Sequence, residues 1–484
     1  MSISLIRLNR DKKITQLLKD LKKHISKESS KKHIKHYCKK LSLHLDIPPK
    51  ILKNEIKILL FKNFENQHGK FKDFFSFKYV LFYSIKFIAI TLFIIFFSKK
   101  YNKKKKYFDL IIDDIDKFNT PKRFFNLINL VKTIFISTNK NYKEKNFYYF
   151  NNYRSVSSNI LFIKYPWRLV EIFFITLYGS IMSRNNLFPI SIEFIKTISK
   201  YRTIFNEINS KYIIQERHYN SSELKNYIFK DMGGKFSCVT QKNILQMNGV
   251  GMYVHSDVFF SLGKETARHL RKYGGKVSKI VPVGSLAMEL NYFNRKKTNN
   301  LKKFDLLVFA SDHDKVFHSG YNTYYFDYMI HFDWIEKFAK EFPGYKIGIK
   351  LKHVIRDKNV INKFKNIKNV KFLLDRKYLS DSYLYAHKAK SLCTWSSTLA
   401  FEFLGQGRTV YFCDPNFKNV SFLPNDSYIK KFKIGNYQIF KRKILNQIRY
   451  KKFRFFNNTK LQNDFCLKSS NVSQNIYLSL KKLD

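Results

Sequence analysis

The chain has 484 residues, enough for two or three domains that each bury a sizeable core. Lys and Arg number 90 against 36 Asp and Glu, which gives a formal net charge of +54. That charge would suit a nucleic acid, but the excess is mostly Lys, spread along the whole chain among Asn, Ile, Phe and Tyr. An AT-biased genome would produce this composition as readily as selection for a polyanionic partner would. Because no basic stripe with aromatic platforms appears, we expect no nucleic-acid partner. A positive surface still favours anionic lipid, lipid-linked pyrophosphate and nucleotide substrates.

The cysteines predict neither structural disulfides nor a zinc site. Their number is odd, they are scattered, and none stands in a CxxC or Cys/His ligand spacing. We therefore expect a reducing compartment. Cys393 and Cys413 stand in apolar strand-like runs, where a thiol packs as a small core residue. The N-terminal stretch MSISLIRLNRDKK is too polar for a cleaved signal peptide.

Residues 1–77 predict two or three basic amphipathic helices, with a turn at Pro48-Pro49. Either an ordinary helical extension or a membrane-docking segment would fit this pattern. A second apolar helix is expected from Trp167 to Met182, as core or as a membrane-facing surface.

Residues 78–106 hold an apolar run followed by a Lys-rich flank. Tyr79 to Phe97 just reaches the length of a transmembrane helix, and Lys99, Lys100 and Lys103–Lys106 follow it. The positive-inside rule would place that flank in the cytoplasm, yet residues 1–77 are also basic and would resist translocation. Lys86 lies about a third of the way along the run. We therefore favour a helix in the plane of the cytoplasmic face of the inner (plasma) membrane, over a single span or a buried core helix.

The stretch Ser391 to Pro415, SLCTWSSTLAFEFLGQGRTVYFCDP, predicts a strand, a hydroxyl-rich turn, a helix, a glycine turn and a second strand. Ser396, Ser397 and Thr398 stand where the helix would begin, and hydroxyls with loose backbone N–H groups there form an anion site. Glu402 follows one turn beyond Thr398, where its carboxylate could accept two vicinal sugar hydroxyls. A phosphate site followed by a diol site indicates a nucleotide sugar. The alternative is an ordinary capped βαβ unit.

The pattern S-S-T-x-x-x-E-x-x-G-x-G-R-x-V-x-F-x-x-P resembles the donor-side motif of two-Rossmann-domain (GT-B) glycosyltransferases. It is similar to the motif of bacterial surface-carbohydrate and capsule enzymes and of the polyol-phosphate transferases of teichoic acid synthesis. The resemblance implies an α/β protein with two Rossmann-like domains facing a cleft. Residues 107–290 would form the acceptor domain and residues 300–427 the nucleotide-donor domain. The basic tail 428–484 would be helical, and its segment 437–450 could cross back to the first domain.

Alternating strands and helices in residues 107–290 predict a parallel, doubly wound sheet. Tyr107 to Ile115 is its expected first strand, and Thr133 to Thr138 and Ile160 to Ile163 are expected next. Further along, four elements resemble the acceptor half of the same family: Glu216-Arg217-His218, Gln241-Lys242-Asn243, Gly263-Lys264 and Val283-Gly284-Ser285. Relatives have Gln-His-Gly where this chain has Gln241-Lys242-Asn243, so the roles of that His and Gly are in doubt.

On the donor side, the resemblance adds Lys350, Lys352 and His353 to the hydroxyl residues and Glu402. Their K-x-K-H sequence resembles the family's K-x-H-P phosphate-binding element, without its Pro. On the acceptor side, Glu216 and His218 are the first candidates for the general base, and Asp113 is next. Arg217 could hold an acceptor phosphate, and Gln241 would contact the acceptor. A leaving pyrophosphate held by a helix start, Lys and His needs no metal, so we expect none and no cofactor.

These observations predict a metal-independent glycosyltransferase that moves a sugar from a nucleotide-sugar donor to a surface polysaccharide or a lipid-linked acceptor. Alternatives are a polyol-phosphate (CDP-glycerol-type) transferase, a non-catalytic family member and, on charge alone, a nucleic-acid-binding protein.

Overall fold

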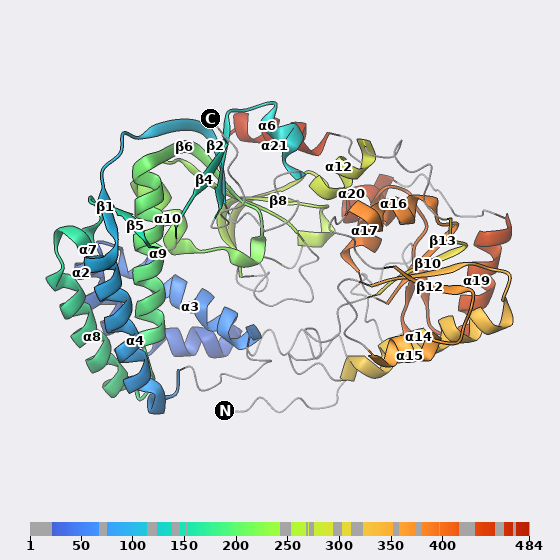
Figure 1. Cartoon of the computed structure of the whole chain (residues 1–484), viewed down its shortest axis with the longest axis horizontal. Coiled ribbons are helices and arrows are strands. Elements are labelled where there is room, and N and C mark those ends of the chain that lie inside the picture. The colour runs from blue at the N-terminus through green and yellow to red at the C-terminus, as the bar shows by residue number, and fades with distance from the viewer. Residues whose placement is uncertain are drawn as a thin grey trace.

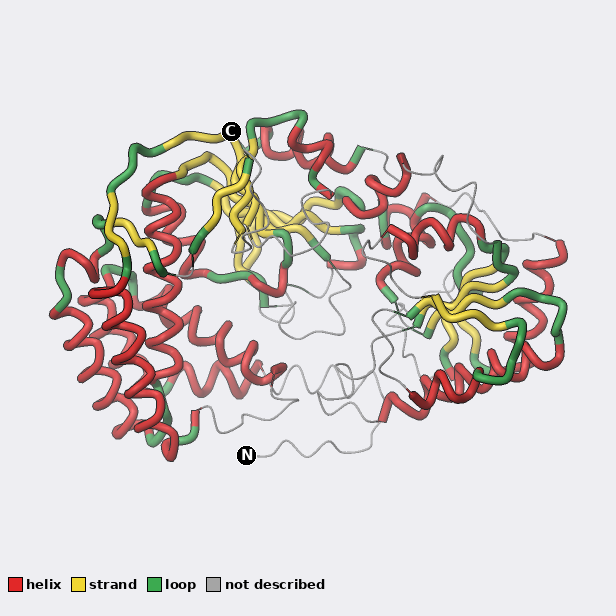
Figure 2. Tube along the Cα trace, in the orientation of Figure 1, coloured by secondary structure: helices red, strands yellow, loops and turns green. Residues whose placement is uncertain are grey.

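The structure is a computed structural model of the whole chain (Figure 1). It describes residues 22–66, 75–113, 123–137, 146–151, 153–242, 253–267, 270, 275–293, 303–310, 323–351, 358–373, 380–395, 397–415, 431–450, 459–467 and 471–483. Two sheets stand apart along the long axis, each with helices around it, and a group of long helices lies beyond the first sheet (Figure 2).

The first sheet has seven parallel strands in the order β4-β3-β2-β6-β7-β8-β9. Their bounds are β2 Lys106–Asp113, β3 Thr133–Ser137, β4 Phe147–Tyr149, β6 Ile208–Gln215, β7 Phe236–Thr240, β8 His255–Ser261 and β9 Lys276–Pro282. The chain adds strands outward from β2 to one edge and then returns to add β6 on the other side of β2. This is the doubly wound Rossmann order, with its reversal between β2 and β6.

One strand prediction in this domain is wrong. Residues Leu161–Lys164 form the short helix α7, and the edge strand is β4 instead. A short apolar run is compatible with a strand and with a buried helical turn, so its period cannot distinguish the two.

The second sheet has six parallel strands in the order β12-β11-β10-β13-β14-β15. They are β10 Leu306–Phe309, β11 Ile347–Lys350, β12 Val370–Leu373, β13 Ser391–Thr394, β14 Tyr411–Cys413 and β15 Lys433–Ile434. Its order repeats the Rossmann pattern, and the reversal lies between β10 and β13. The expected fold class, two Rossmann-like α/β domains, is therefore confirmed.

Both sheets are covered on both faces, which explains their continuous apolar strands. In the first sheet, Ile111 and Ile213 face a core with α9 (Phe188–Glu207) and α10 (Glu223–Asp231). Their neighbours Leu110 and Ile214 face the opposite core, with α6 (Phe125–Ile128) and α21 (Val472–Lys481). This alternation follows from the two-residue period of a strand.

The second sheet is covered in the same way. Helices α14 (Thr323–Glu341), α15 (Lys358–Phe364) and α19 (Tyr437–Tyr450) pack on one face. Helices α16 (Ser380–Lys388), α17 (Thr398–Gly405) and α20 (Thr459–Phe465) pack on the other.

The N-terminal helices α2 (Lys32–Leu45) and α3 (Pro49–Asn66) pack against the first domain. An apolar helical segment, Phe77–Phe97, follows them and comprises η2 (Phe77–Tyr79), α4 (Val80–Leu92) and the π-helical η3 (Phe93–Phe97). Among the described residues, this segment is the one helix that is both long enough and apolar enough to cross a membrane. It lies beside α8 (Trp167–Ser183), and a two-stranded sheet of β1 (Lys99–Tyr101) and β5 (Ser155–Ser157) follows its end.

The chain returns from the second domain to the first through α20 and α21. The backbone of residues 463–467 bonds to the turn after β8, where Lys264 N donates to Asn463 O and Leu467 N to Leu262 O. A side chain at Gly263 or at Gly405 would collide with the backbone of residues 464–466, so glycine permits this close approach. Helix α21 then packs on the first sheet, while α19 stays on the second, so the expected crossing by 437–450 is wrong.

Candidate functional site

The points where strand order reverses lie next to the acidic and hydroxyl residues singled out above. Asp113 ends β2, and Glu216 follows β6 directly, with its N–H donating to Asp113 O across 3.2 Å. In the second domain, Ser397 and Thr398 follow β13, which pairs with β10. Ligands of open α/β sheets bind outside the carboxyl ends of the strands at such reversals. The candidate site therefore has two halves. One, at β2 and β6, is where we expect the acceptor (the acceptor half), and the other, at β10 and β13, is where we expect the donor (the donor half).

Three cations surround the Glu216 carboxylate in the acceptor half. Arg123 Nη1 lies 3.1 Å from Oε1, Arg217 Nε lies 3.1 Å from Oε2, and Lys242 Nζ lies 3.8 Å from Oε1. Glu216 itself is buried, whereas the three cations are 17–23% exposed. The cluster carries a net charge of +2 and reaches solvent through its cations. It can therefore take an anion such as a phosphate, and Glu216 can act as a base only if an arginine moves aside.

Asp113 belongs to a buried ion pair behind this cluster. Lys225 Nζ of α10 and Tyr201 Oη of α9 both donate to Asp113 Oδ2 across 2.9 Å. Burial alone would raise the pKa of Asp113, but the Lys225 and Lys200 ammonium groups and these hydrogen bonds outweigh it and hold the pKa below its ordinary value. An ionised carboxylate fixed in this way positions α10 against β2 and is a poor proton acceptor.

His218 is fully buried, and its Nδ1 accepts a hydrogen bond from the Lys242 backbone N–H across 3.1 Å. Burial, together with the nearby Lys242 charge, lowers the pKa of His218 to about 3. Its ring is therefore neutral at ordinary pH and connects two loops. Gln241 is also buried, and its Oε1 accepts from the Leu262 N–H across 2.9 Å, so this side chain too connects loops.

Glu402 of α17 lies between the two domains. Its Oε1 accepts from Ser285 Oγ across 2.5 Å, and its Oε2 accepts from Tyr383 Oη of α16 across 2.7 Å. Burial raises the pKa of Glu402, and the two hydrogen bonds and the charge of Arg123 oppose this only in part. The two hydroxyls occupy the two oxygens that we assigned to a ribose diol. A ribose would therefore have to replace at least one of them.

The start of α17 is less occupied. Ser397 is the N-cap residue in extended conformation (φ −157°, ψ 136°), is half-buried, and makes no side-chain capping bond. Thr398 opens the helix. The Ala400 N–H already donates to Ser397 O across 3.2 Å. The Ser397 hydroxyl and the helix start can still attract an anion. Ser396 lies outside the described residues.

The remaining donor-side candidates are only partly described. Lys350 ends β11, is buried, and donates to the Leu351 carbonyl across 2.7 Å. Its ammonium thus lies at the carboxyl edge of the sheet. Lys352 and His353 lie outside the described residues.

The structure adds residues that sequence reasoning did not select as site residues. Arg123 contacts Glu216, and its charge also acts on Glu402, so it lies between the two halves of the site. Only its basic character marked it, because it precedes a short helix with no motif. Ser285 and Lys242 did stand in elements that resemble the family, whereas nothing in the sequence distinguished Tyr383.

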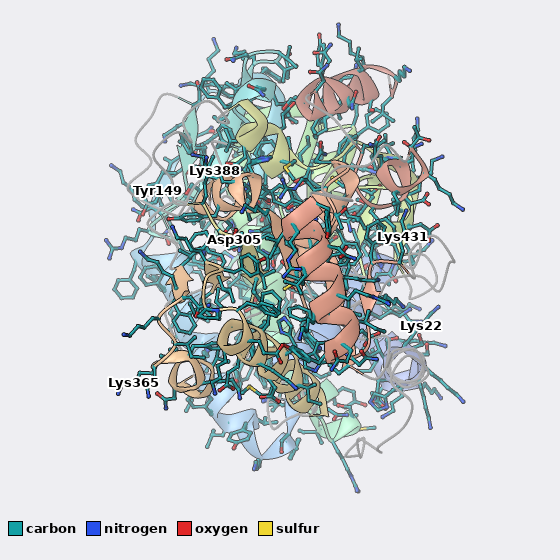
Figure 3. All side chains as sticks on the ribbon, turned by 90° about the vertical axis from the view of Figure 1, so that its right-hand side faces the viewer. Lys22, Tyr149, Asp305, Lys365, Lys388 and Lys431 are labelled. Atoms are coloured by element: carbon teal, nitrogen blue, oxygen red, sulfur yellow. The ribbon has the colours of Figure 1, made fainter. Side chains whose placement is uncertain are left out.

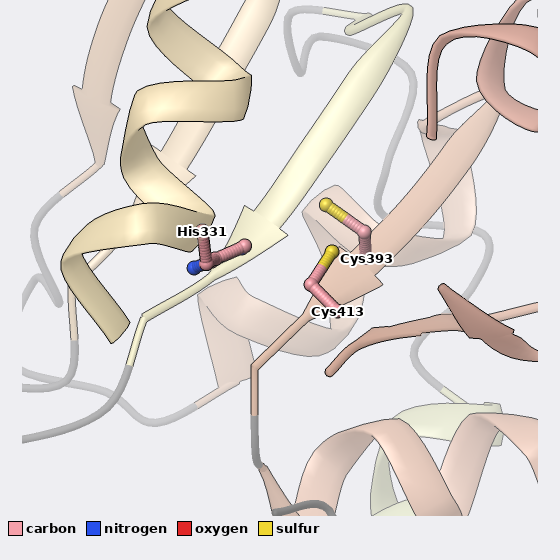
Figure 4. Close-up of side chains that lie close together, drawn as sticks. All are labelled: His331, Cys393 and Cys413. Carbon is pink, nitrogen blue, oxygen red and sulfur yellow. The ribbon is translucent and has the colours of Figure 1, made fainter. Parts of the chain in front are cut away.

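One group in the described part of the chain has the side chains to hold a metal. His331 of α14, Cys393 of β13 and Cys413 of β14 place one ligand atom each within 4.8 Å of one another (Figure 4). A metal would need both thiols deprotonated. Burial, with the Cys393 thiol beside it, raises the pKa of Cys413 well above its ordinary value. We therefore interpret the group as packing in the second domain's core, and the absence of a metal stays a prediction.

No protein-family model matches the chain, and no curated protein matches its sequence. Among solved structures, the chain is similar to a UDP-GlcNAc 2-epimerase from Neisseria meningitidis bound to UDP-GlcNAc, with 12% identity and a TM-score of 0.45 over 78% of this chain and 100% of that one. It is similar to a UDP-N-acetylglucosamine 2-epimerase from Listeria monocytogenes, with 11% identity and a TM-score of 0.43 over 78% and 96%. MurG from Acinetobacter baumannii has 9% identity and a TM-score of 0.34 over 78% and 99%.

Proposed function

We propose that the protein is a glycosyltransferase that moves a sugar from a nucleotide-sugar donor to a growing or lipid-linked surface glycan, such as a capsule polysaccharide or O-antigen. One observation carries the proposal. Two buried acids from different domains, Glu216 and Glu402, lie beside the strand reversals of their sheets. Arg123 donates a hydrogen bond to Glu216, and its positive charge favours the ionised form of Glu402. Such a pairing of acids with a cationic cluster suits a reaction between an anionic donor and a hydroxyl acceptor.

In the donor half, the start of α17 would hold the diphosphate through backbone N–H groups and the hydroxyls of Ser396, Ser397 and Thr398. Lys350, Lys352 and His353 would add positive charge at the edge of the sheet. Glu402 would accept the ribose hydroxyls, in place of Ser285 and Tyr383. The leaving nucleoside diphosphate would be stabilised by these groups, with no step that requires a metal.

In the acceptor half, Glu216 remains the proposed base. Arg123, Arg217 and Lys242 offer a net positive surface that would hold the phosphate of a lipid-linked acceptor, and its arrival would draw an arginine away from Glu216. The carboxylate would then be able to accept the proton of the acceptor hydroxyl. His218, Asp113 and Gln241 would keep this surface in place.

The alternatives differ in what they require. A polyol-phosphate transferase would use the same anion sites with a CDP-linked donor, and a non-catalytic member would bind nucleotide without turnover. A nucleic-acid-binding protein would need its basic residues gathered on one surface. In Figure 3, Lys365 and Lys388 instead lie on one side of the view, and Lys22 and Lys431 lie on the other.

Titration of the full-length protein with UDP, GDP, ADP and CDP by calorimetry tests the donor half. We expect one nucleoside diphosphate to bind, and Glu402→Ala to weaken that binding by about 1–3 kcal/mol, the scale of a lost hydrogen bond to a charged group. Glu216→Gln should leave this affinity unchanged and lower turnover by about a hundredfold, the usual share of a general base. Equal affinity in Glu402→Ala and the parent would contradict the donor assignment. Binding of CDP alone would favour the polyol-phosphate alternative.

A further inference from the structure

The apolar segment Phe77–Phe97 exposes large side chains and buries small polar ones. Ser84 and Thr91, with Phe87 and Ile94, recur at three- and four-residue spacing and form its buried side. The exposed fraction of the opposite side reaches 73% at Leu81 and 74% at Phe97. This distribution is the reverse of a water-soluble amphipathic helix, in which polar residues face outward.

Helix α8 has the same inverted pattern beside it. Its buried side contains Thr176, Gly179 and Ser180 as well as two aliphatic residues. Its exposed side is formed mostly by large apolar or aromatic residues, and it also holds Glu171, which pairs with His44 of α2. The apolar and aromatic residues are Trp167, Val170, Phe174, Tyr178, Ile181 and Met182. The two helices lie in contact on the side of the first domain away from the second domain (Figure 1). We call their combined exposed surface the α4–α8 face.

Behind the α4–α8 face, hydroxyl groups bond to one another. Ser191 Oγ of α9 lies 2.5 Å from Tyr37 Oη of α2 and 2.7 Å from Thr176 Oγ1 of α8. The Ser180 hydroxyl donates to Thr176 O across 2.7 Å and accepts from Leu187 N across 3.0 Å. Small residues and hydroxyl bonds between helices, with large apolar side chains outward, are typical of helices that contact lipid.

We propose that the α4–α8 face docks into one leaflet of an anionic lipid bilayer, with both helices in the plane of the membrane. The two ends of the Phe77–Phe97 segment are held by the same domain. Asn186 N donates to Phe75 O across 2.9 Å at one end, and Lys99 N donates to Arg154 O across 2.8 Å at the other. A helix that crossed the bilayer would place these two ends on opposite sides.

Charged neighbours support the in-plane arrangement. Exposed Lys86, in the middle of α4, leans over the half-buried Tyr83 ring, 5.5 Å from its centre. In the in-plane arrangement its long side chain can extend its charge to the headgroups. Helix α2 packs along α8 and exposes Lys32, Lys35, Lys39 and Lys40, which would be costly inside hydrocarbon. Near a membrane surface, the same lysines would meet anionic headgroups. This inference does not depend on the proposed reaction.

Trp167 provides a built-in probe, because it is 57% exposed on this face while Trp334 and Trp395 are buried. The chain has no other tryptophan. We expect the full-length protein to bind preformed phosphatidylcholine vesicles that contain about a third phosphatidylglycerol. Its emission should shift to shorter wavelength, and brominated lipid should quench it. Trp167→Phe should bind equally and lose both signals.

The double variant Ile85→Glu, Phe174→Glu changes one side chain on each helix, exposed by 60% and 61%, and should fold normally. We expect its bound fraction in vesicle flotation to fall by about tenfold or more, because two charges replace apolar side chains that the membrane would bury. Tyr450→Glu, at a side chain that is 65% exposed on α19 of the second domain, is the matched control and should bind like the parent. Unchanged binding by the double variant would overturn the proposal. The proposal would also be overturned if the parent does not bind vesicles but is a dimer by light scattering, while the double variant is a monomer. That result would show that a second copy of the chain covers the α4–α8 face.

Discussion

The Ser285 hydroxyl donates to Glu402 Oε1 across 2.5 Å and thereby joins the first domain to the second. The Ser285 hydroxyl oxygen also accepts a hydrogen bond from the Met288 N–H across 3.2 Å, so Ser285 caps α12 (Leu286–Phe293). Gly284, with a φ of 98°, provides the turn that brings Ser285 to this position. Both residues are buried, so this contact between the domains is shielded from solvent.

Ser285→Ala removes the donor and leaves a buried carboxylate oxygen with one partner fewer. We expect the free energy of unfolding to fall by about 1–3 kcal/mol, the cost of an unsatisfied buried polar group. Urea unfolding followed by circular dichroism measures the change. Ser278→Ala, at an exposed serine on β9, is the control and should stay within about 0.5 kcal/mol of the parent. An equal effect of both substitutions would mean that the contact contributes nothing.

Glu402 makes the stability depend on pH in a defined direction. Because burial raises its pKa, its folded environment favours the protonated form, and this contribution is present below the ordinary carboxyl range and is lost as pH rises through the raised value. Glu402→Gln should remove that loss, since a neutral amide can bond to both hydroxyls. We expect the unfolding free energy of the variant, relative to the parent, to be higher at about pH 8 than at about pH 5. A constant difference between variant and parent would show that Glu402 is ionised at no cost.

The Lys225–Asp113 pair can be compared with an exposed pair on the same helix. Lys225 and Asp113 are 2% and 1% exposed, whereas Lys230 and Asp257 are 43% and 25% exposed. Lys225→Met should therefore cost about 3–5 kcal/mol of stability, because it leaves an uncompensated buried charge. Lys230→Met should cost no more than about 1 kcal/mol. Urea unfolding of both variants measures the two losses of stability. Similar losses would refute the claim that the buried Lys225–Asp113 pair matters more to stability than the exposed pair.

The pKa of about 3 predicts that His218 does not titrate where enzymes are usually assayed. In His218→Asn, the amide oxygen can still accept from Lys242 N–H, so the fold is retained. We expect the pH–rate profile between about pH 5 and 8 to keep the parent's shape, since the ring is neutral throughout. A step near the ordinary histidine pKa in the parent that is absent in the variant would restore His218 as the base.

Sequence reasoning predicted β2, β3, β13 and β14, because each one is an apolar run bounded by turn residues. It also located the start of α17 from Ser397 and Thr398. It failed at 160–163, where a short apolar run folds as a helix, and at 437–450, where a basic amphipathic helix stays on its own domain. Nothing local marks which sheet such a helix covers. That choice depends on the apolar surface that each domain leaves open.

The sequence by itself determined the alternating α/β pattern, the length of the apolar segment and the residue types at the strand ends, because these follow from periodicity over a few neighbouring residues. Only the tertiary structure decided which partners meet. Arg123 reaches Glu216 from 93 residues away, and Ser285 reaches Glu402 from 117 residues away. Such pairings, and the burial that shifts the pKa values of Asp113, His218 and Glu402, arise when separate elements pack together. The orientation of the apolar side chains of α4 and α8 was decided in the same way, because packing against α2 and α9 selected the sides that carry hydroxyls and left the others exposed.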